Sequence, residues 1–223
     1  MSDNKPHSEG KCMMQEKRHG QVSLEFMLVF GIMLILLLYS VNNVTFREGS
    51  TSTEALRIQI SLEEKNLANA ISCTIDQVYT QGPGAKSTTY VKLTYLRNGD
   101  ILEKGLNTNN PEIFITYGNY SNKGNGTYVG VIGSGITPIL TGGDKNVFWS
   151  RSMYQAILYN DSLVWSPSGS ITVGSSTFNG LKINPTSLPA TLKIVVEWNP
   201  DNSNSWTFNS TKGELRININ PGG

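Results

Sequence analysis

A nearly unbroken apolar run close to the start of the chain restricts its possible folds more than any other feature. The run covers residues 26–41, or twenty residues when it is counted from Val22. That is long for the apolar part of a secretion signal, about 7–15 residues, and sufficient for a membrane-crossing helix. The basic residues before the run include Lys11, Lys17 and Arg18. They predict that the N-terminal end faces the cytoplasm and that the bulk of the chain lies outside.

The residues behind the run are a poor match to an ordinary signal-peptidase site. Residues 38–43 read LYSVNN, whereas such a site has small residues in an A-x-A pattern. Cleavage behind the run is therefore not expected. Three interpretations remain: a permanent single-span anchor, an uncleaved or unusually cleaved secretion signal, or a helix that a cut in front of the run leaves at the mature N-terminus.

One carboxylate, Glu25, lies just inside the apolar segment. A charge at the centre of a bilayer costs roughly 2.5–3.5 kcal/mol by insertion scales, and less near the edge. Near the edge, Glu25 could reach water or bind the free N–H groups at the start of its own helix. The interpretation that we favour is a cut after Gly20, which makes Gln21 the first residue and Glu25 the fifth. The carboxylate can then meet a free amine in its own chain or in a neighbouring subunit.

The stretch GQVSLEF at residues 20–26 resembles the Q-x-S-x-E-F start of archaeal type IV pilin precursors with class III signal sequences. The resemblance implies that a prepilin peptidase cleaves between Gly20 and Gln21. It also implies that Glu25 is the assembly residue, which pairs with the N-terminal amine of the subunit ahead and sets the register of the filament. The implied partners are other copies of the chain or other pilins. The implied location is an extracellular surface filament, with the precursor in the cytoplasmic membrane.

A second helix is predicted behind the apolar segment. Thr51 and Glu54 have the spacing of a capping box, and Gln81-Gly82-Pro83-Gly84 is a strong stop signal. Apolar residues between them recur at spacings of three, four and seven: Leu56, Ile60, Leu67, Ile71, Ile75 and Val78. We expect residues 63–66 mostly off this stripe and Cys73 buried and inert beside it. Cys12, the other cysteine, lies in the expected leader.

The chain from about residue 85 onward has the pattern of a β protein. Short segments rich in β-branched and aromatic residues alternate with turn residues at intervals of about ten, and Asn98-Gly99 is a hairpin signal. The predicted strands are 88–96, 101–104, 112–117, 127–132, 152–159, 163–166, 171–173, 178–183, 192–198 and 215–219. The predicted fold is therefore α+β: a long N-terminal hydrophobic and amphipathic helix followed by an antiparallel β-rich head, a sandwich or a small barrel.

The sequence accordingly divides into three predicted parts. Residues 1–20 form a cleaved leader peptide, and residues 21–81 form the N-terminal helix. Within that helix, residues 21–41 are the hydrophobic membrane and assembly segment and residues 51–81 are amphipathic. Residues 85–223 form an extracellular β head.

The residues needed for common catalytic and metal chemistry are scarce. His7 and His19 are the only histidines, and both lie in the expected leader. Residues 201–205 carry side-chain oxygens at alternate positions, but the sixth and twelfth positions of a calcium loop are Trp206 and Lys212 instead of Gly and Glu. A turn is the favoured interpretation. We expect no enzymatic activity, no cofactor and no metal, and the net charge of +1 indicates no nucleic-acid partner.

Two further points concern the head. Five acceptor sequons for N-glycosylation occur, about as many as chance would give: Asn43, Asn119, Asn125, Asn160 and Asn209. The loop around Asn119 and Asn125 is the favoured site if the head lies outside the cell. The sequence does not identify a ligand of the head.

Two alternatives to a pilin remain. The first is a single-span membrane-anchored surface protein whose β head binds a ligand and never polymerises. The second is a secreted hydrolase that uses carboxylates, although no spacing supports it. The carboxylates considered for it are Glu112, Asp144, Asp161 and Glu197.

Overall fold

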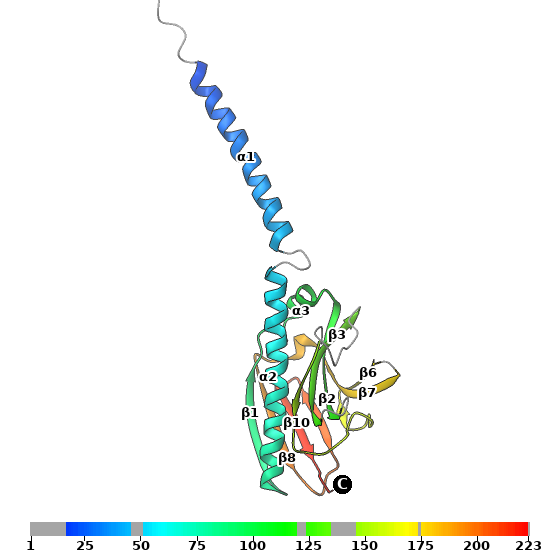
Figure 1. Cartoon of the computed structure of the whole chain (residues 1–223). Helices are drawn as coiled ribbons and strands as arrows, with labels where there is room; N and C mark the ends of the chain where they lie inside the picture. Colours follow the sequence, from blue (N-terminus) through cyan, green and yellow to red (C-terminus); the bar gives the residue numbers. More distant parts are fainter. Residues whose placement is uncertain (1–16, 46–50, 120–123, 135–145, 174, 223) are drawn as a thin grey trace, which may run out of the picture. The chain divides into compact units, whose positions relative to one another are not determined.

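The computed structural model describes residues 17–45, 51–119, 124–134, 146–173 and 175–222 (Figure 1). The chain divides into two compact units, residues 1–47 and residues 48–223. The first unit contains helix α1 (Lys17–Thr45). The second contains helix α2 (Thr51–Gln81), the short helices α3 (Gly99–Leu106) and η1 (Pro185–Ser187), and all the strands of the described chain.

Helix α1 contains the predicted apolar segment. Its side chains are described from Leu24 to Val41, a stretch of eighteen residues with a mean hydropathy of 2.4. At 1.5 Å per residue this stretch is about 27 Å long, close to the thickness of the hydrocarbon part of a bilayer. By length and composition α1 is therefore compatible with a membrane-spanning helix, and also with a signal helix.

Helix α2 is the amphipathic helix that the spacing of apolar residues predicts. Five of the six stripe residues are fully buried, and Leu56 is half-buried. The helix ends where Gly82 adopts a φ of +91° and donates its N–H to the carbonyl of Val78 at 3.2 Å. Glycine tolerates this left-handed conformation, which explains the stop. Residues 46–50, between α1 and α2, lie outside the described chain.

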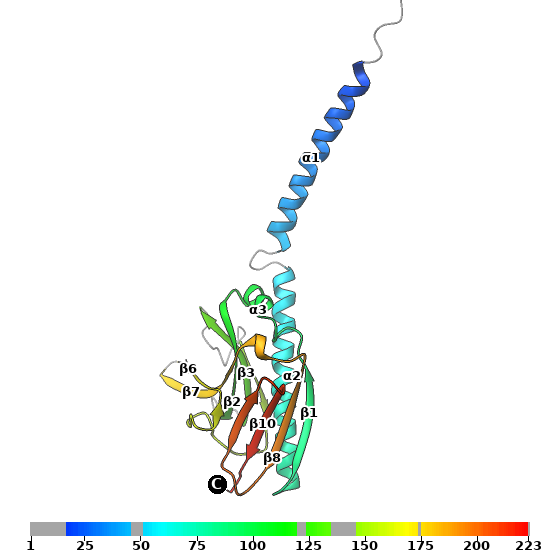
Figure 2. The same cartoon turned by 180° about the vertical axis from the view of Figure 1, so that it is seen from behind.

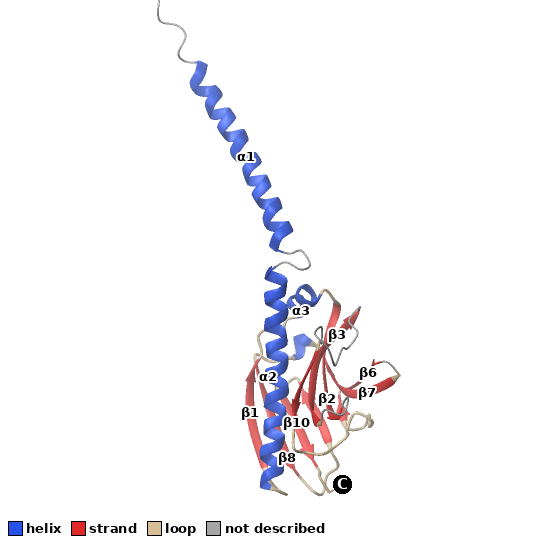
Figure 3. Cartoon of the chain, viewed as in Figure 1, coloured by secondary structure: helices blue, strands red, loops and turns tan. Residues whose placement is uncertain are grey.

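The strands form two separate five-stranded sheets (Figure 3). The first sheet has the spatial order β1 (Lys86–Lys92), β8 (Thr191–Trp198), β10 (Glu214–Ile219), β9 (Ser205–Asn209) and β5 (Trp165–Ser166). The second has the order β4 (Val147–Arg151), β3 (Asn125–Ser134), β2 (Asn109–Asn119), β7 (Ser176–Ile183) and β6 (Ser168–Val173). Neighbouring strands are antiparallel except β8 with β10 and β5 with β9. The α+β prediction is confirmed, and of its two β arrangements the closed barrel is excluded.

Helix α2 closes one side of the core that the two sheets share. It packs against β1 and β8 of the first sheet and against β3 and β4 of the second (Figures 1 and 2). Because β1 and β4 are the terminal strands of their sheets, α2 covers the gap between two sheet edges. Its apolar stripe thereby joins one continuous core with residues of both sheets, such as Ile194 of β8 and Ile115 of β2.

Two of the tryptophans, Trp165 and Trp206, belong to this core. Trp206 and Trp165 are buried, with ring centroids 5.2 Å apart. Trp206 also contacts Tyr117, which contacts Tyr154. Rings at such distances bury large apolar areas and fix the side chains of strands from both sheets against one another.

Two predicted strands and the predicted hairpin are wrong. Residues 99–106 form helix α3, because the Asn98 side chain accepts a hydrogen bond from the N–H of Ile101 at 3.2 Å and caps the helix. Residues 152–159 follow β4 without forming a strand. There the Ser152 hydroxyl and the Met153 N–H both donate to the carboxylate of Asp76 on α2, outside any strand ladder.

Two strands escaped prediction. Strand β4 has only five residues, and β9 follows directly after the polar residues considered as a calcium loop. Among the described residues no group of three or more His, Cys, Asp or Glu side chains could hold a metal ion. Residues 200–202 form a turn that leads into β9, as the sequence analysis favours.

Candidate functional site

The apolar surface of α1 is the most unusual feature of the first unit. Every large apolar side chain from Leu24 to Val41 is between 46% and 69% exposed. Phe26 and Phe30 stack one turn apart, with ring centroids 6.3 Å apart. A soluble protein rarely exposes so continuous an apolar surface, and where it occurs it marks contact with a membrane or with another protein.

Glu25 is the one charged residue in this exposed stretch. Its helical neighbours three and four positions on are Leu28 and Val29, so the carboxylate is bordered by apolar side chains. No hydrogen bond or ion pair joins Glu25 to any residue that the structure describes. The carboxylate therefore has full capacity to accept hydrogen bonds from a group supplied by another molecule.

The expected cleavage site lies at the beginning of the same helix. Gly20 and Gln21 are the fourth and fifth residues of α1, which begins at Lys17. The first four N–H groups of a helix have no partner within it, and helix ends open readily. In a chain that begins at Gln21, Glu25 would lie one turn from the new helix N-terminus, where a negative charge is favourable.

The five sequons differ in accessibility. Asn160 is exposed on a turn, and Asn209 is exposed at the end of strand β9. Asn125 is only 6% exposed and its Nδ2 donates to Gln155 Oε1 at 3.1 Å, so its amide is not open to modification in the folded head. Asn119 is half-buried, and the side chain of Asn43 lies outside the described chain. Among the described sequons, the exposed sites at Asn160 and Asn209 are thus better acceptors than the buried site at Asn125.

The carboxylates considered for a hydrolase do not converge. Glu112 on β2 pairs with Lys182 at 2.6 Å, and Glu197 on β8 of the other sheet pairs with Lys86 at 3.3 Å. Asp161 accepts from the N–H of Leu163 within a turn at 2.8 Å. Asp144 lies outside the described residues. Glu112 and Glu197 line two different pockets.

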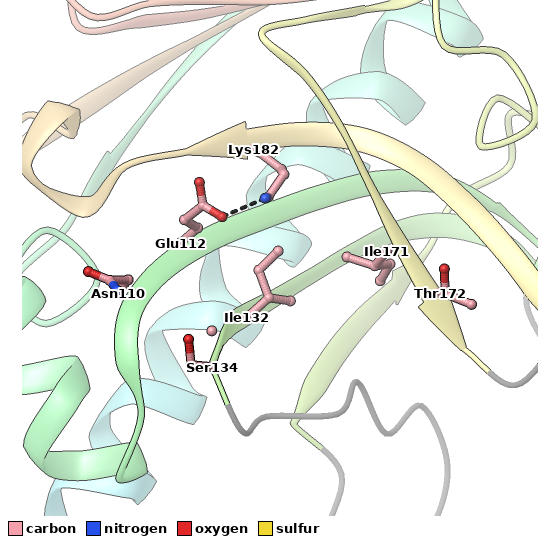
Figure 4. A pocket seen from close by; sticks show the side chains of 8 residues that line it. Asn110, Glu112, Ile132, Ser134, Ile171, Thr172 and Lys182 are labelled. Atoms are coloured by element: carbon pink, nitrogen blue, oxygen red, sulfur yellow. Dashed lines mark ion pairs between the residues drawn. The ribbon is translucent and has the colours of Figure 1, made fainter.

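A pocket of about 430 Å³ lies beside Glu112, between β2, β3, β6 and β7 (Figure 4). Glu112 and Lys182 form their ion pair on one side of it, and Ile132 and Ile171 contribute apolar surface. The Lys182 ammonium already compensates the Glu112 carboxylate. The pocket therefore presents neither a free charge nor a nucleophile with an adjacent base.

A row of polar side chains on α2 faces the sheets, which the sequence analysis missed. We call Glu63, Glu64, Lys65, Ser72 and Asp76 the polar seam. Residues 63–66 were expected mostly off the apolar stripe, yet Glu63 and Glu64 are 7% and 3% exposed. The spacing indicated their burial. Both lie between Ile60 and Leu67, three or four positions from each, and therefore on the same face of the helix.

The polar seam lies along the free edge of β4, where a further strand of the sheet would otherwise pair. Lys65 Nζ donates to the carbonyl of Trp149, and Ser72 Oγ donates to the carbonyl of Ser150 at 2.8 Å. Beyond the end of β4, Asp76 Oδ1 accepts from Ser152 Oγ at 2.6 Å and from the N–H of Met153 at 2.8 Å. An edge strand leaves such backbone groups open, and here side chains of a helix satisfy them.

Glu63 binds the segment between β1 and α3. Its carboxylate accepts from three successive backbone N–H groups: those of Thr94, Tyr95 at 2.7 Å and Leu96 at 3.1 Å. Three donors converging on one buried side chain suit an ionised carboxylate. Glu63 thus fixes the turn that leads from the first sheet into α3.

Cys73 is exposed, which corrects the expectation of a buried thiol. It lies two positions from both Ile71 and Ile75. Two helical positions correspond to a rotation of about 200°, so Cys73 lies on the face opposite the apolar stripe.

We therefore expect the thiol of Cys73 to react with a maleimide in the folded chain at the rate of an exposed cysteine. The measurement is mass spectrometry of a Cys12→Ser chain after timed labelling under native conditions, with Cys12→Ser/Cys73→Ser as the control. Labelling that begins only when denaturant unfolds the chain would contradict the exposed position.

Comparison of the chain with models of protein families, with curated proteins and with solved structures finds no match. Two features of the described chain bear on function: the uncovered apolar helix with its single carboxylate, and the head that α2 completes.

Proposed function

We propose that the chain is the structural subunit of an archaeal type IV pilus-like surface filament and not an enzyme. The observation that carries the proposal is the exposed apolar surface of α1 together with Glu25 in the GQVSLEF stretch. A prepilin peptidase removes residues 1–20 by cutting between Gly20 and Gln21. The mature chain then polymerises through its N-terminal helix, with itself or with other pilins.

The driving force for assembly would be burial of the apolar side chains of α1. Removing apolar surface from water contributes roughly 25 cal/mol per Å², and α1 exposes such surface along eighteen residues. In the precursor the same surface is covered by the membrane. The apolar contacts have little direction, so a specific polar contact is needed to set the position of one subunit against the next.

Glu25 supplies that contact in the proposal. Its carboxylate pairs with the N-terminal amine of Gln21 in the neighbouring subunit, inside an apolar surrounding. Such a pair adds little net stability compared with apolar packing, but a charge left without its partner there is strongly unfavourable. The pair therefore penalises every alignment of the helices that leaves Glu25 unpaired.

The head forms the outer surface of the filament and is proposed to serve surface adhesion. Asn160 and Asn209 are its proposed glycosylation sites, because both residues are exposed. Mature subunits lie outside the cell, and the precursor lies in the cytoplasmic membrane with its N-terminus inside.

A membrane-anchored surface protein with a ligand-binding head is the second candidate. The length and hydropathy of residues 24–41 favour it as much as they favour a pilin precursor. The two candidates differ in what happens to residues 1–20, which an anchored protein keeps.

The deciding experiment is mass spectrometry of the N-terminal peptide of the protein recovered from the cell surface. We expect the peptide to begin at Gln21 and to retain the apolar segment that follows. Surface protein that begins at Met1 would support the anchored protein. Extracellular protein that begins after Ser40 would contradict both candidates, because it would lack the apolar helix.

A further inference from the structure

We propose that Glu64 is an acid-stabilised latch: as a neutral carboxylic acid it holds α2 on the second sheet, and it weakens that contact when it ionises as pH rises. The inference concerns the head and stands apart from the proposed assembly of α1. It rests on the position of Glu64 in the polar seam, on its burial and on the charged groups around it.

The position of Glu64 is at the point where the pairing of β3 with β4 ends. The ladder runs from Gly126 opposite Arg151 to Gly130 opposite Val147. The N–H of the next residue, Val131, donates to Glu64 Oε1 at 2.9 Å. Glu64 therefore accepts a hydrogen bond from a backbone N–H of β3 just beyond the residues that pair with β4.

The surroundings of Glu64 do not favour a charge. It is 3% exposed, and the helix residues three and four positions from it, such as Ile60, Leu67 and Ala68, are fully buried. Within the described chain, its only hydrogen bond is the one from Val131, and no cation forms an ion pair with it. A buried carboxylate with a single N–H donor and no cation is costly, whereas the protonated acid is far less so.

The charged groups near Glu64 are few and do not compensate it. On α2 the preceding residue, Glu63, repels a second negative charge, and the ammonium of Lys65 is directed to the carbonyl of Trp149. Strand β3 carries no Asp, Glu, Lys, Arg or His. Arg151 of β4 lies opposite Gly126, at the other end of the paired region from Val131. On the α3 side, Arg57 donates to Glu54 and to the carbonyl of Gly105.

The two adjacent carboxylates of the polar seam thus have different environments. Glu63 receives three backbone N–H donors and Glu64 receives one. Burial raises the pKa of Glu64 well above its usual value, the Val131 hydrogen bond lowers it only in part, and the charge of Glu63 raises it further.

The sign of the pH effect follows from this difference between the folded and unfolded chain. In the unfolded chain Glu64 loses its proton near pH 4.3, the ordinary value for Glu. The folded chain keeps that proton to higher pH, so the stability that Glu64 contributes is complete in acid and is lost as pH rises. Other carboxylates have the opposite effect on stability. Lys193 lowers the pKa of Glu214, so the stability that Glu214 contributes is lost as pH falls. A variant of Glu64 is therefore needed to isolate its contribution.

The test compares the full chain in detergent micelles with its Glu64→Gln variant between about pH 5 and pH 9. Gln is a neutral side chain of the same shape that can still accept from Val131. Guanidinium unfolding is followed by tryptophan fluorescence, since all four tryptophans lie in residues 48–223. The midpoint of Glu64→Gln relative to the natural chain is expected to rise steadily with pH. Glu54→Gln, on an exposed position of the same helix, should change in parallel with the natural chain.

The proposal would be overturned if the unfolding midpoints of Glu64→Gln and of the natural chain differed by a constant amount across the pH range. A second measurement does not depend on how well the variant folds. The infrared spectrum of the natural chain at about pH 7 should contain the C=O band of a protonated carboxylic acid, which disappears in strongly alkaline solution. A spectrum without that band at pH 7 would equally overturn the proposal.

Discussion

Replacement of Glu63 by alanine is expected to lower the free energy of unfolding of the head by about 3 kcal/mol. The change leaves the N–H groups of Thr94, Tyr95 and Leu96 without their acceptor. An unsatisfied buried donor costs about 1–3 kcal/mol, but water can reach part of the Thr94 and Tyr95 backbone, so the costs do not add in full. Against a typical total of about 5–15 kcal/mol for a domain, such a loss is severe.

The measurement is guanidinium unfolding followed by tryptophan fluorescence at a fixed detergent concentration. Glu54→Ala is the matched control, because Glu54 lies on the same helix, is exposed, and makes only an exposed ion pair with Arg57 at 3.2 Å. Exposed pairs of this kind contribute about 0–1 kcal/mol. Glu63→Ala and Glu54→Ala chains with equal stability would show that the three hydrogen bonds do not hold the turn before α3.

The importance of Glu63 illustrates which part of the fold could be predicted from the sequence. Apolar periodicity correctly located α1, α2 and most strands, because burial of apolar side chains dominates where these elements lie. It also gave the α+β class. The interval of seven positions from Ile60 to Leu67 appeared to be an interruption of the stripe. The helix nevertheless faces the core there, because two carboxylate side chains in this interval are buried.

The features that sequence reasoning missed depend on contacts between distant parts of the chain. Asn98-Gly99 fits a hairpin locally, but the residues behind it dock on α2, where the carbonyl of Gly105 accepts from Arg57 Nε at 2.9 Å. At the start of residues 152–159, Ser152 and Met153 bind the carboxylate of Asp76 and not a neighbouring strand. Neither partner is near in sequence, so local patterns carry no sign of either contact.

The candidate assembly site, in contrast, is visible in a local sequence pattern. Glu25 and the apolar segment are recognisable from the sequence because a charge inside an apolar run is locally anomalous. The structure adds that the apolar side chains are uncovered within the described chain and that Gly20 and Gln21 are the fourth and fifth residues of α1. What covers the apolar surface after assembly depends on other molecules and stays a prediction.

Glu25→Ala is expected to abolish surface filaments while removal of residues 1–20 continues. The variant leaves the N-terminal amine of each subunit without its proposed partner in an apolar surrounding. Removing one member of a buried pair typically costs about 3–5 kcal/mol, which corresponds to a loss of roughly 10²- to 10⁴-fold in the assembly equilibrium. Electron microscopy of cells counts the filaments, and an immunoblot separates precursor from mature subunit.

Glu25→Gln and Ser23→Ala test whether a loss of filaments results from the loss of the Glu25 charge. Glu25→Gln keeps the size of the side chain and removes its charge, so it should lose filaments nearly as completely as Glu25→Ala if the ion pair is what matters. Ser23→Ala changes a nearby polar residue of the same helix without touching the charge, and it should assemble normally. Abundant filaments from both Glu25 variants would reduce the carboxylate to a helix-end cap, worth only about 0.3–1 kcal/mol. In that case apolar burial alone would have to align the subunits.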